Sequence, residues 1–373
     1  MRLTGARVFD PLKGFVTRDL CIADERIAAD SADEAIDLSG CILIPGLTDL
    51  HFHGCRGADF SDGDAAGLQT MADYELSRGV TQICPAGMTL DESQLLEICR
   101  TAAAHKENSS SGAELVGINL EGPFLSEKKK GAQNGAWLRN PDTDLLFCLK
   151  AESNGLVKLV SVAPELPGAI DFIHAVKNEV AVSVAHTACN YDEALAAFDA
   201  GARQVTHLFN GMNAFAHRDP GPVGAAADSN CRVELICDGI HIHPAMVRAV
   251  FKLFGIDNVI LISDTMRAAG MEDGQYTLGG QDVIVKGKLA TLVDGTIAGS
   301  VTDLMSCMTT AVSFGIPLKD AVTAAAVNSA KALGIYDEVG SLDVGKLANI
   351  AVLNSDLSLK AVLLRGKVVS GAL

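Results

Sequence analysis

The sequence predicts an α/β fold: a (β/α)8 barrel of the TIM type, with a small β-sandwich domain built from both chain termini. Short apolar runs alternate with helix-length segments through the middle of the chain, which is typical of repeated strand–helix–strand units. Polar residues follow these runs all the way along, as the catalytic face of a barrel requires. Both ends of the chain consist instead of short β-prone pieces broken by turns.

Eight apolar runs are the expected barrel strands. Helical patterns, such as those at 192–202 and 244–255, separate most of them. Residues 275–297 should form an inserted hairpin region, and helices at 302–314 and 317–333 should lead back to the terminal β-pieces. A doubly wound open sheet is the alternative, but it would concentrate the polar residues at one switch point. The expected strands are 47–53, 80–86, 115–121, 157–163, 180–186, 202–208, 233–239 and 259–265.

The two ends of the chain should pair with each other. Segments such as RLTGARVF near the start and LKAVLLRGKVV near the end are both short and rich in residues that favour β-strands. We therefore expect residues 1–46 and 335–373 to form the small β domain, and residues 47–334 to form the barrel. A chain of 373 residues has room for both.

Charge and composition exclude several classes of protein. With 30 Lys and Arg against 46 Asp and Glu, the net charge of −16 offers no surface for nucleic acid or for an anionic membrane. We expect neither a membrane-spanning segment nor a signal peptide, because no sufficiently long apolar run is present. The ten cysteines form no CxxC pair, which indicates buried free thiols in a reducing cytoplasm.

Metal-binding and acidic residues fall at the ends of the expected strands. His51 and His53 lie two positions apart, so both imidazoles should point to the same side of the first strand. A single histidine near a strand end is more often a structural residue than a ligand, but here five separate strands carry such groups. The strand-end residues are His51, His53, Glu121, His186, His207 and Asp264, and Asp238 and His241 follow the seventh strand.

Imidazole and carboxylate groups suit zinc, iron or manganese, and no set of thiolates indicates a structural cysteine site. Cys55 and Cys189 stand close to His53 and His186 in the sequence, and we interpret both cysteines as packing residues. No serine or cysteine lies in the setting of an activated nucleophile, so direct attack by water is expected.

Several longer stretches resemble the amidohydrolase superfamily, and within it the N-acetylglucosamine-6-phosphate deacetylases. They occur in the family's order and extend from the first strand to the last helix. The block at 205–226 is the most specific of them. The matching stretches include IPGLTDLHFHG at 44–54, LEGPFLSEKKKGAQN at 120–134, VTHLFNGMNAFAHRDPGPVGAA at 205–226, LISDTMRAAGMEDGQYTLGG at 261–280 and IAGS at 297–300.

The resemblance implies removal of the acetyl group from the 2-amino group of a 6-phosphorylated amino sugar. It implies that Glu121, His186 and His207 are the principal metal ligands. A further pair, His51 and His53, is kept only by some members and would serve a second ion. The implied cofactor is therefore one or two divalent ions per subunit, zinc first, with iron or manganese as alternatives. Asp264 matches the catalytic acid and base.

The resemblance also implies substrate contacts. Arg218 matches a residue that reaches the neighbouring subunit's site, so a homodimer with shared phosphate pockets is implied. In KKGAQN, Gln133 replaces a histidine of some members, and glutamine cannot carry a proton; VTDLM after Ser300 also departs from the family's pattern. The implied substrate-binding residues are Ala132, Gln133, Asn210, Gly211, Arg218, His241, Ala298, Gly299 and Ser300.

Three alternatives stay open at this stage. The substrate could be the galacto instead of the gluco epimer, because the metal ligands do not distinguish them. The chain could be another amidohydrolase, acting on a cyclic amide or deaminating a base. It could also be a non-catalytic relative, although such a protein should have lost its metal ligands.

Overall fold

The computed structural model describes residues 1–30 and 34–373. Its centre is a ring of eight parallel strand positions that pair in chain order, which confirms the predicted barrel. The second and third positions are each divided into two short strands. The strands are β8 (Leu47–Asp49), β11 (Val80–Ile83) with β12 (Ala86–Gly87), β13 (Glu114–Leu115) with β14 (Ile118–Leu120), β15 (Val157–Val162), β16 (Ala181–Val184), β17 (Gln204–Val205), β18 (Arg232–Ile236) and β19 (Val259–Ile262).

The ring closes between its first and last strands, just beyond their carboxyl ends. The amide of Asp264 donates to the carbonyl of His51 over 3.0 Å, and the amide of His53 donates to the carbonyl of Thr265 over 2.7 Å. The closure therefore places the two expected histidine ligands that follow β8 directly beside the expected catalytic aspartate that follows β19.

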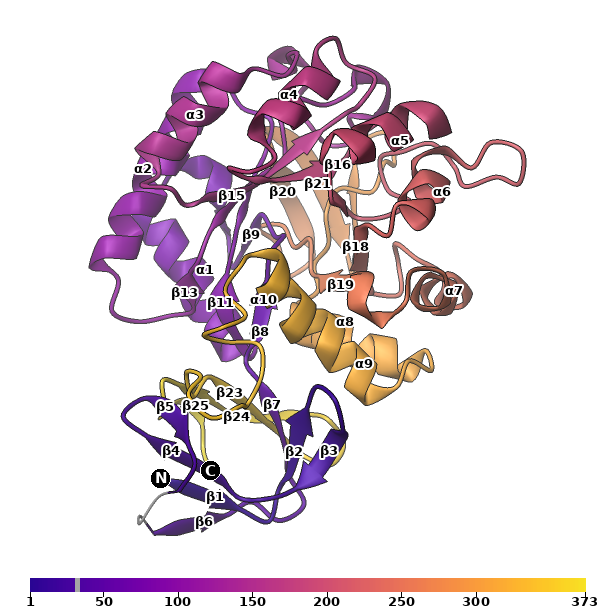
Figure 1. The fold of residues 1–373 in the computed structure, drawn as a ribbon. Coiled ribbons are helices and arrows are strands. Elements are labelled where there is room, and N and C mark those ends of the chain that lie inside the picture. Colours follow the sequence, from indigo (N-terminus) through magenta and orange to yellow (C-terminus); the bar gives the residue numbers. More distant parts are fainter. Residues whose placement is uncertain (31–33) are drawn as a thin grey trace.

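Helices surround the barrel strands (Figure 1). Several begin at acidic or amide side chains that accept hydrogen bonds from the first turn, among them Asp64, Asp91, Asp142, Asn190 and Asp303. These residues explain why the helices start where they do. The helices are α1 (Ala65–Ser77), α2 (Glu92–Asn108), α3 (Thr143–Glu152), α4 (Ala169–Val176), α5 (Tyr191–Ala200), α6 (Gly221–Asp228), α7 (Pro244–Phe254), α8 (Leu304–Ser313), α9 (Leu318–Val322) and α10 (Asn328–Ala332), the last two joined by one π-helical segment at Thr323–Val327.

The inserted region forms a three-stranded antiparallel sheet and is therefore one strand larger than a hairpin. It comprises β20 (Gly274–Leu278), β21 (Gln281–Lys286) and β22 (Leu289–Leu292). Its apolar face, including Leu278 and Val283, packs in one buried cluster with Met88, Ala132 and Ala298 from the ends of the barrel. The insertion consequently covers part of the face where the predicted site residues lie.

The two ends of the chain pair as expected. Strand β23 (Ile350–Leu353) lies antiparallel to β7 (Ile42–Pro45) within a six-stranded sheet of order β25-β24-β23-β7-β2-β3. A second sheet has the order β5-β4-β1-β6, and residues of both sheets share one buried core, as in a sandwich. The remaining strands are β1 (Arg2–Thr4), β2 (Arg7–Asp10), β3 (Gly14–Thr17), β4 (Leu20–Ala23), β5 (Arg26–Ala28), β6 (Ala35–Asp37), β24 (Leu359–Leu364) and β25 (Lys367–Gly371).

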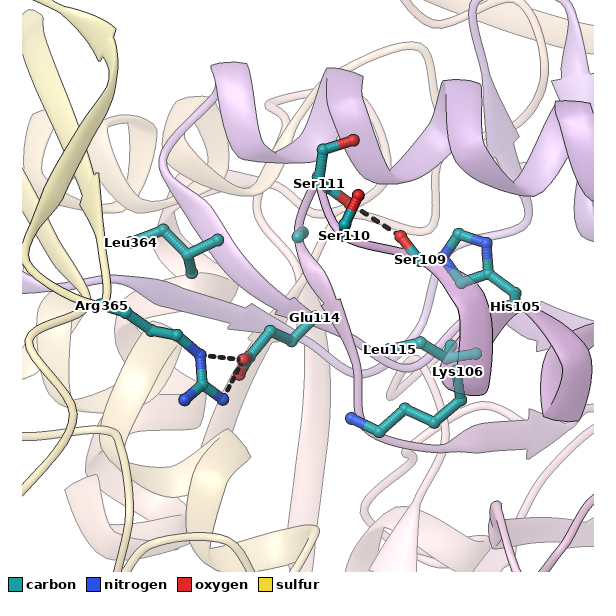
Figure 2. Close-up of a pocket in the computed structure, with 11 residues that line it drawn as sticks. His105, Lys106, Ser109, Ser110, Ser111, Glu114, Leu115, Leu364 and Arg365 are labelled. Atoms are coloured by element: carbon teal, nitrogen blue, oxygen red, sulfur yellow. Dashed lines mark hydrogen bonds and ion pairs between the residues drawn. The ribbon is translucent and has the colours of Figure 1, made fainter. Parts of the chain in front are cut away.

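Both termini lie in this part of the molecule (Figure 1). Domain boundaries at 46/47 and 334/335 stay a prediction. A cavity of about 350 Å³ lies where the terminal strands meet the start of β13. Figure 2 shows that Arg365 and Glu114 pair across this junction, with Arg365 Nε 2.8 Å from Glu114 Oε1. Since this cavity opens at the amino-terminal ends of the barrel strands, it lies away from the face where barrels carry their chemistry.

The cysteines largely match expectation. All ten are free and nine are buried, including Cys55 and Cys189, while Cys148 is exposed and corrects the prediction that all would be buried. Within the described part of the chain, no helix is both long and apolar enough to cross a membrane.

Candidate active site

Glu121 stands at the centre of a buried cluster of four histidines and two carboxylates. It follows β14, and its Oε1 lies 2.8 Å from Nε2 of His207 and 3.1 Å from Nε2 of His186. These two histidines follow β17 and β16, so three neighbouring strand ends converge on one carboxylate. Glu121, His186 and His207 can together hold a metal ion.

His51 and His53 form a second group with the same carboxylate. Nε2 of His53 lies 3.3 Å from Glu121 Oε2, and Nε2 of His51 lies 3.5 Å from Glu121 Oε1. His51, His53 and Glu121 also satisfy the geometry of a metal site. Glu121 is therefore shared by both groups of possible metal ligands.

The hydrogen bonds on the far side of the rings fit this role. Nδ1 of His53 contacts the carbonyl of Ala86 at 3.1 Å, and Nδ1 of His186 contacts the carbonyl of Lys129 at 2.9 Å. A carbonyl accepts but never donates, so Nδ1 carries the proton in both rings. Nε2 of each ring then faces carboxylate oxygens, so a cation bound between them would take the place of a proton on Nε2.

The charged groups of the cluster perturb one another. Burial raises the pKa of Glu121, but the charge of His51 and hydrogen bonds with His186 and His207 hold it well below its usual range. Burial lowers the pKa of His53, but hydrogen bonds with Asp264 and Glu121 raise it to about 10. The centre of the cluster therefore carries a carboxylate that stays ionised, as a metal ligand must.

Asp264 lies beside the second group. Its Oδ1 is 3.2 Å from Nε2 of His53 and 3.8 Å from Nε2 of His51. Burial raises its pKa, but the hydrogen bond with His53 and the charges of His51 and His53 bring the pKa below its ordinary value. The carboxylate is thus available as a proton acceptor at neutral pH.

The backbone is unusual at three of these residues. His186, His207 and Asp264 have φ angles of 40°, 27° and 50°, in the left-handed region that residues with a Cβ rarely adopt. Such conformations cost about 1–3 kcal/mol each and gather at functional sites. The abrupt turn after β16, β17 and β19 is what directs these side chains toward the cluster.

Gln133 is bound inside the protein. Its Nε2 donates to Glu121 Oε2 over 2.8 Å, and its Oε1 accepts from the amide of Thr89 over 2.7 Å. The side chain also lines the cavity, as predicted for a substrate contact. The resemblance did not anticipate that its amide would hold the central carboxylate.

A cavity of about 290 Å³ opens above the cluster. Ala298 and Ser300, two of the predicted substrate-binding residues, do not line it. Ala298 is buried against Met88 and Leu278, and the Ser300 hydroxyl donates to the carbonyl of Ser263 over 2.6 Å. The predicted substrate-binding residues that do line it are Ala132, Gln133, Asn210, Gly211, His241 and Gly299.

His241 is held by Asp238. Nδ1 of His241 lies 2.7 Å from Asp238 Oδ2, and the backbone amides of Ile240 and His241 donate to Asp238 Oδ1. Burial lowers the pKa of His241, but the hydrogen bond and charge of Asp238 raise it above its ordinary value. The raised pKa favours the imidazolium form of His241, which would suit an anion in the cavity.

Arg218 does not line this cavity. It is exposed on the segment between β17 and α6, which projects from the barrel at the right of Figure 1.

Glu234 is a site residue that the sequence analysis missed. It lies fully buried in β18, and its Oε2 is 2.7 Å from Nδ1 of His51. Its Oε1 accepts from Nε2 of Gln204 over 2.5 Å. A charged residue within the apolar run VELIC was the available signal, because burying a charge is costly unless it is paired.

Comparison with known proteins agrees with this geometry. A model described as the amidohydrolase family matches residues 42–369. N-acetylglucosamine-6-phosphate deacetylase of Bacillus subtilis (strain 168) is 39% identical over 335 residues, covering 88% of this chain and 84% of that protein. N-acetylgalactosamine-6-phosphate deacetylase of Escherichia coli O157:H7 is 33% identical, with 88% of each chain covered.

A solved structure is also closely similar. A variant of N-acetyl-D-glucosamine-6-phosphate deacetylase from Mycobacterium smegmatis, in complex with N-acetyl-D-glucosamine-6-phosphate, superimposes with a TM-score of 0.94. It is 33% identical, and 99% of each chain is covered. The barrel and its metal-ligand cluster define an amidohydrolase. More narrowly, the chain belongs to the N-acetylglucosamine-6-phosphate deacetylase family within the amidohydrolases.

Proposed function

We propose that this protein is a metal-dependent hydrolase that converts N-acetyl-D-glucosamine 6-phosphate into D-glucosamine 6-phosphate and acetate. The observation that carries the proposal is the pair of histidine groups sharing Glu121 at the floor of the cavity, with Asp264 beside them. The relatives and the solved structure of this family act on or bind the same phosphorylated sugar.

Glu121, His186 and His207 would hold the first divalent ion, and His51 and His53 would complete a second site with Glu121. Zinc is the expected ion, with iron or manganese as alternatives, since all three accept imidazole and carboxylate ligands. A divalent ion at such a site lowers the pKa of water and polarises an amide carbonyl. The protein's own part is to fix the ligand geometry and to move protons.

Asp264 performs the proton transfer. Its ionised carboxylate accepts the proton of the attacking water as the acetamide carbon becomes tetrahedral. The same carboxyl group then gives the proton to the sugar's amine, which leaves as a neutral amine when the C–N bond breaks. Asp264 can serve both steps in turn because its low pKa keeps it ionised before attack and its position beside His53 keeps it near the floor of the cavity.

The remaining groups orient the sugar. Asn210, the Gly211 backbone and His241 line the wall of the cavity, and the imidazolium form of His241, which its raised pKa favours, suits a phosphate or a hydroxyl oxygen. Arg218 would reach the phosphate from a second copy of the chain, so the proposed assembly is a homodimer. A guanidinium fits phosphate oxygens well.

The galacto epimer remains a second candidate substrate, supported by the relative from Escherichia coli O157:H7. The gluco epimer is preferred because the relatives from Bacillus subtilis and Vibrio furnissii are more similar, at 39% and 36% identity. We place the enzyme in the cytoplasm, in amino sugar catabolism, since ten free cysteines suit a reducing compartment.

Acetate release tests the proposal directly. Purified enzyme should release acetate from N-acetylglucosamine 6-phosphate, more slowly from its galacto epimer, and far more slowly from unphosphorylated N-acetylglucosamine. A chelator should abolish the release, and added divalent ion should restore it. Absence of acetate from both phosphorylated sugars, with metal present, would refute the proposal.

A further inference from the structure

We infer that Glu234, supported by Gln204, positions His51 and thereby controls occupancy of the second metal site. The inference rests on the proposed metal-dependent function and concerns two buried residues of the barrel strands that do not line the active-site cavity. Glu234 and Gln204 are positioning residues, because both act through His51.

Both carboxylate oxygens of the buried Glu234 have hydrogen-bond partners. Oε2 lies 2.7 Å from Nδ1 of His51, and the backbone amide of His207 donates to the same oxygen over 3.4 Å. Oε1 accepts from Gln204 Nε2 over 2.5 Å. One carboxylate thus touches a ligand of each proposed ion, His51 through its ring and His207 through its backbone.

This contact decides which nitrogen of His51 faces the site. A carboxylate that is already held by Gln204 accepts the Nδ1 proton of His51, so Nε2 is the nitrogen left to bind a cation in place of a proton. Nε2 is buried and has no hydrogen-bond partner, and it points toward Glu121 Oε1 at 3.5 Å and Asp264 Oδ1 at 3.8 Å. An unpartnered buried nitrogen aimed between two carboxylates is placed as a metal ligand.

His51 differs from the other site histidines in this partner. Nδ1 of His53 and of His186 faces a backbone carbonyl, and Nδ1 of His207 is without a hydrogen-bond partner among the described residues. A carboxylate partner raises the basicity of an imidazole more than a neutral carbonyl does. His51 should therefore be the strongest imidazole ligand of its group.

Electrostatic attraction leads to the same conclusion. Glu121, Asp264 and Glu234 are buried carboxylates within 4 Å of the His51 ring. Each of them attracts a cation bound at His51, and replacing Glu234 by a neutral residue of the same shape would remove its share of that attraction. Glu234 therefore favours the second ion through charge as well as through orientation.

Titration of metal-depleted protein with Co²⁺ tests the inference. Wild type should bind two Co²⁺ ions per subunit. Equilibrium dialysis with elemental analysis counts the bound ions, and the visible spectrum of Co²⁺ reports binding at each site. Glu234→Gln, which preserves shape and removes the charge, should keep the first ion and weaken the second by about 10- to 100-fold. Ser161→Ala is the matched control, because Ser161 is equally buried in the barrel but contacts Thr206; it should bind both ions as wild type does.

Gln204→Met provides a second, volume-conserving variant if Glu234→Gln does not fold. It removes the side-chain donor that holds Glu234, and it should weaken the second ion by a smaller factor. Unchanged affinity for the second ion in a folded variant of either kind, or a single ion in wild type at saturating Co²⁺, would overturn the inference. Two ions with no acetate release by wild type would refute the proposed function while leaving the inference on Glu234 intact.

Discussion

Gln133 holds the central carboxylate of the site, Glu121, through a hydrogen bond of 2.8 Å from its Nε2 to Oε2 of Glu121. The amide of Thr89 donates to Oε1 of the same glutamine over 2.7 Å, so the side-chain amide cannot rotate without losing both contacts. Gln133 thereby leaves Oε1 of Glu121 to His186 and His207. Gln133 therefore supports the proposed metal ligand Glu121, and it lines the cavity as well.

Gln133→Ala should therefore weaken metal binding as well as catalysis. Loss of a partner behind a metal ligand typically costs about 10- to 100-fold in metal affinity. Elemental analysis after dialysis against graded chelator measures this loss. Gln281→Ala is the matched control, because Gln281 holds the carbonyl of Ala132 on the same loop without touching Glu121. Full metal retention by Gln133→Ala would show that the hydrogen bond to Glu121 has no such role.

Asp264→Asn should abolish most of the turnover while sugar phosphate still binds. The change keeps the shape of the side chain and removes its ability to accept a proton, which typically costs about 10²–10⁴ in rate. Single-turnover acetate release, compared with equilibrium binding of the product D-glucosamine 6-phosphate, separates chemistry from binding. Turnover near that of wild type would rule out the assigned role of Asp264. The loss should exceed that of Gln133→Ala.

Binding of the phosphorylated substrate should weaken at high pH. Asp238 raises the pKa of His241 above its ordinary value of about 6.5, so the imidazolium persists above that pH and disappears only as pH rises through the raised pKa. KM for the 6-phosphate sugar should then increase at alkaline pH. Asp238→Asn should move this increase to lower pH, and His241→Gln should remove it. The same increase in His241→Gln would assign the effect to another group.

The fold was predictable because its signals are local. Alternation of apolar runs with helical segments located all eight strand positions, and the β-prone ends predicted the terminal sheets. The closure of the ring could not be read from periodicity, because it depends on backbone hydrogen bonds between residues far apart in the chain, such as Asp264 and His51. The division of the second and third strand positions into β11 with β12, and β13 with β14, gave no distinct pattern either.

The cluster around Glu121 was predictable for a related reason: metal-binding residue types fall at strand ends, and parallel strands bring those ends together. Glu234 was not predicted as a site residue because it lies within a strand, where a single charged residue belongs to no recognisable motif. The partner of Gln133 depends on the path of a loop that the sequence does not specify. Arg218 is a different case, since its proposed site lies on another copy of the chain.

Removal of the ion pair at the junction of Figure 2 should cost little stability. Arg365 and Glu114 have side chains that are 42% and 20% exposed, and such exposed pairs contribute about 0–1 kcal/mol. Arg365→Ala should lower the free energy of unfolding by that amount, and high salt should shrink the difference. Denaturant titration of Arg365→Ala measures the effect. Lys106→Ala is the control, because Lys106 lines the same cavity. A loss of several kcal/mol would show that the junction depends on this pair.

The position of Arg218 on a projecting, exposed segment makes a shared active site testable by complementation. Arg218→Ala should raise KM for the phosphorylated sugar by about 10- to 100-fold, since a charged hydrogen bond contributes roughly 1.5–3 kcal/mol. It should barely change the slow reaction with unphosphorylated sugar.

In a two-fold dimer, mixing Arg218→Ala with Asp264→Asn creates hybrid dimers with one pocket that has both residues intact. Random exchange of equal amounts should restore about a quarter of the wild-type sites, because half of the dimers are hybrids and each has one complete pocket. No recovery, despite subunit exchange verified by mass spectrometry, would place Arg218 outside the neighbouring subunit's site.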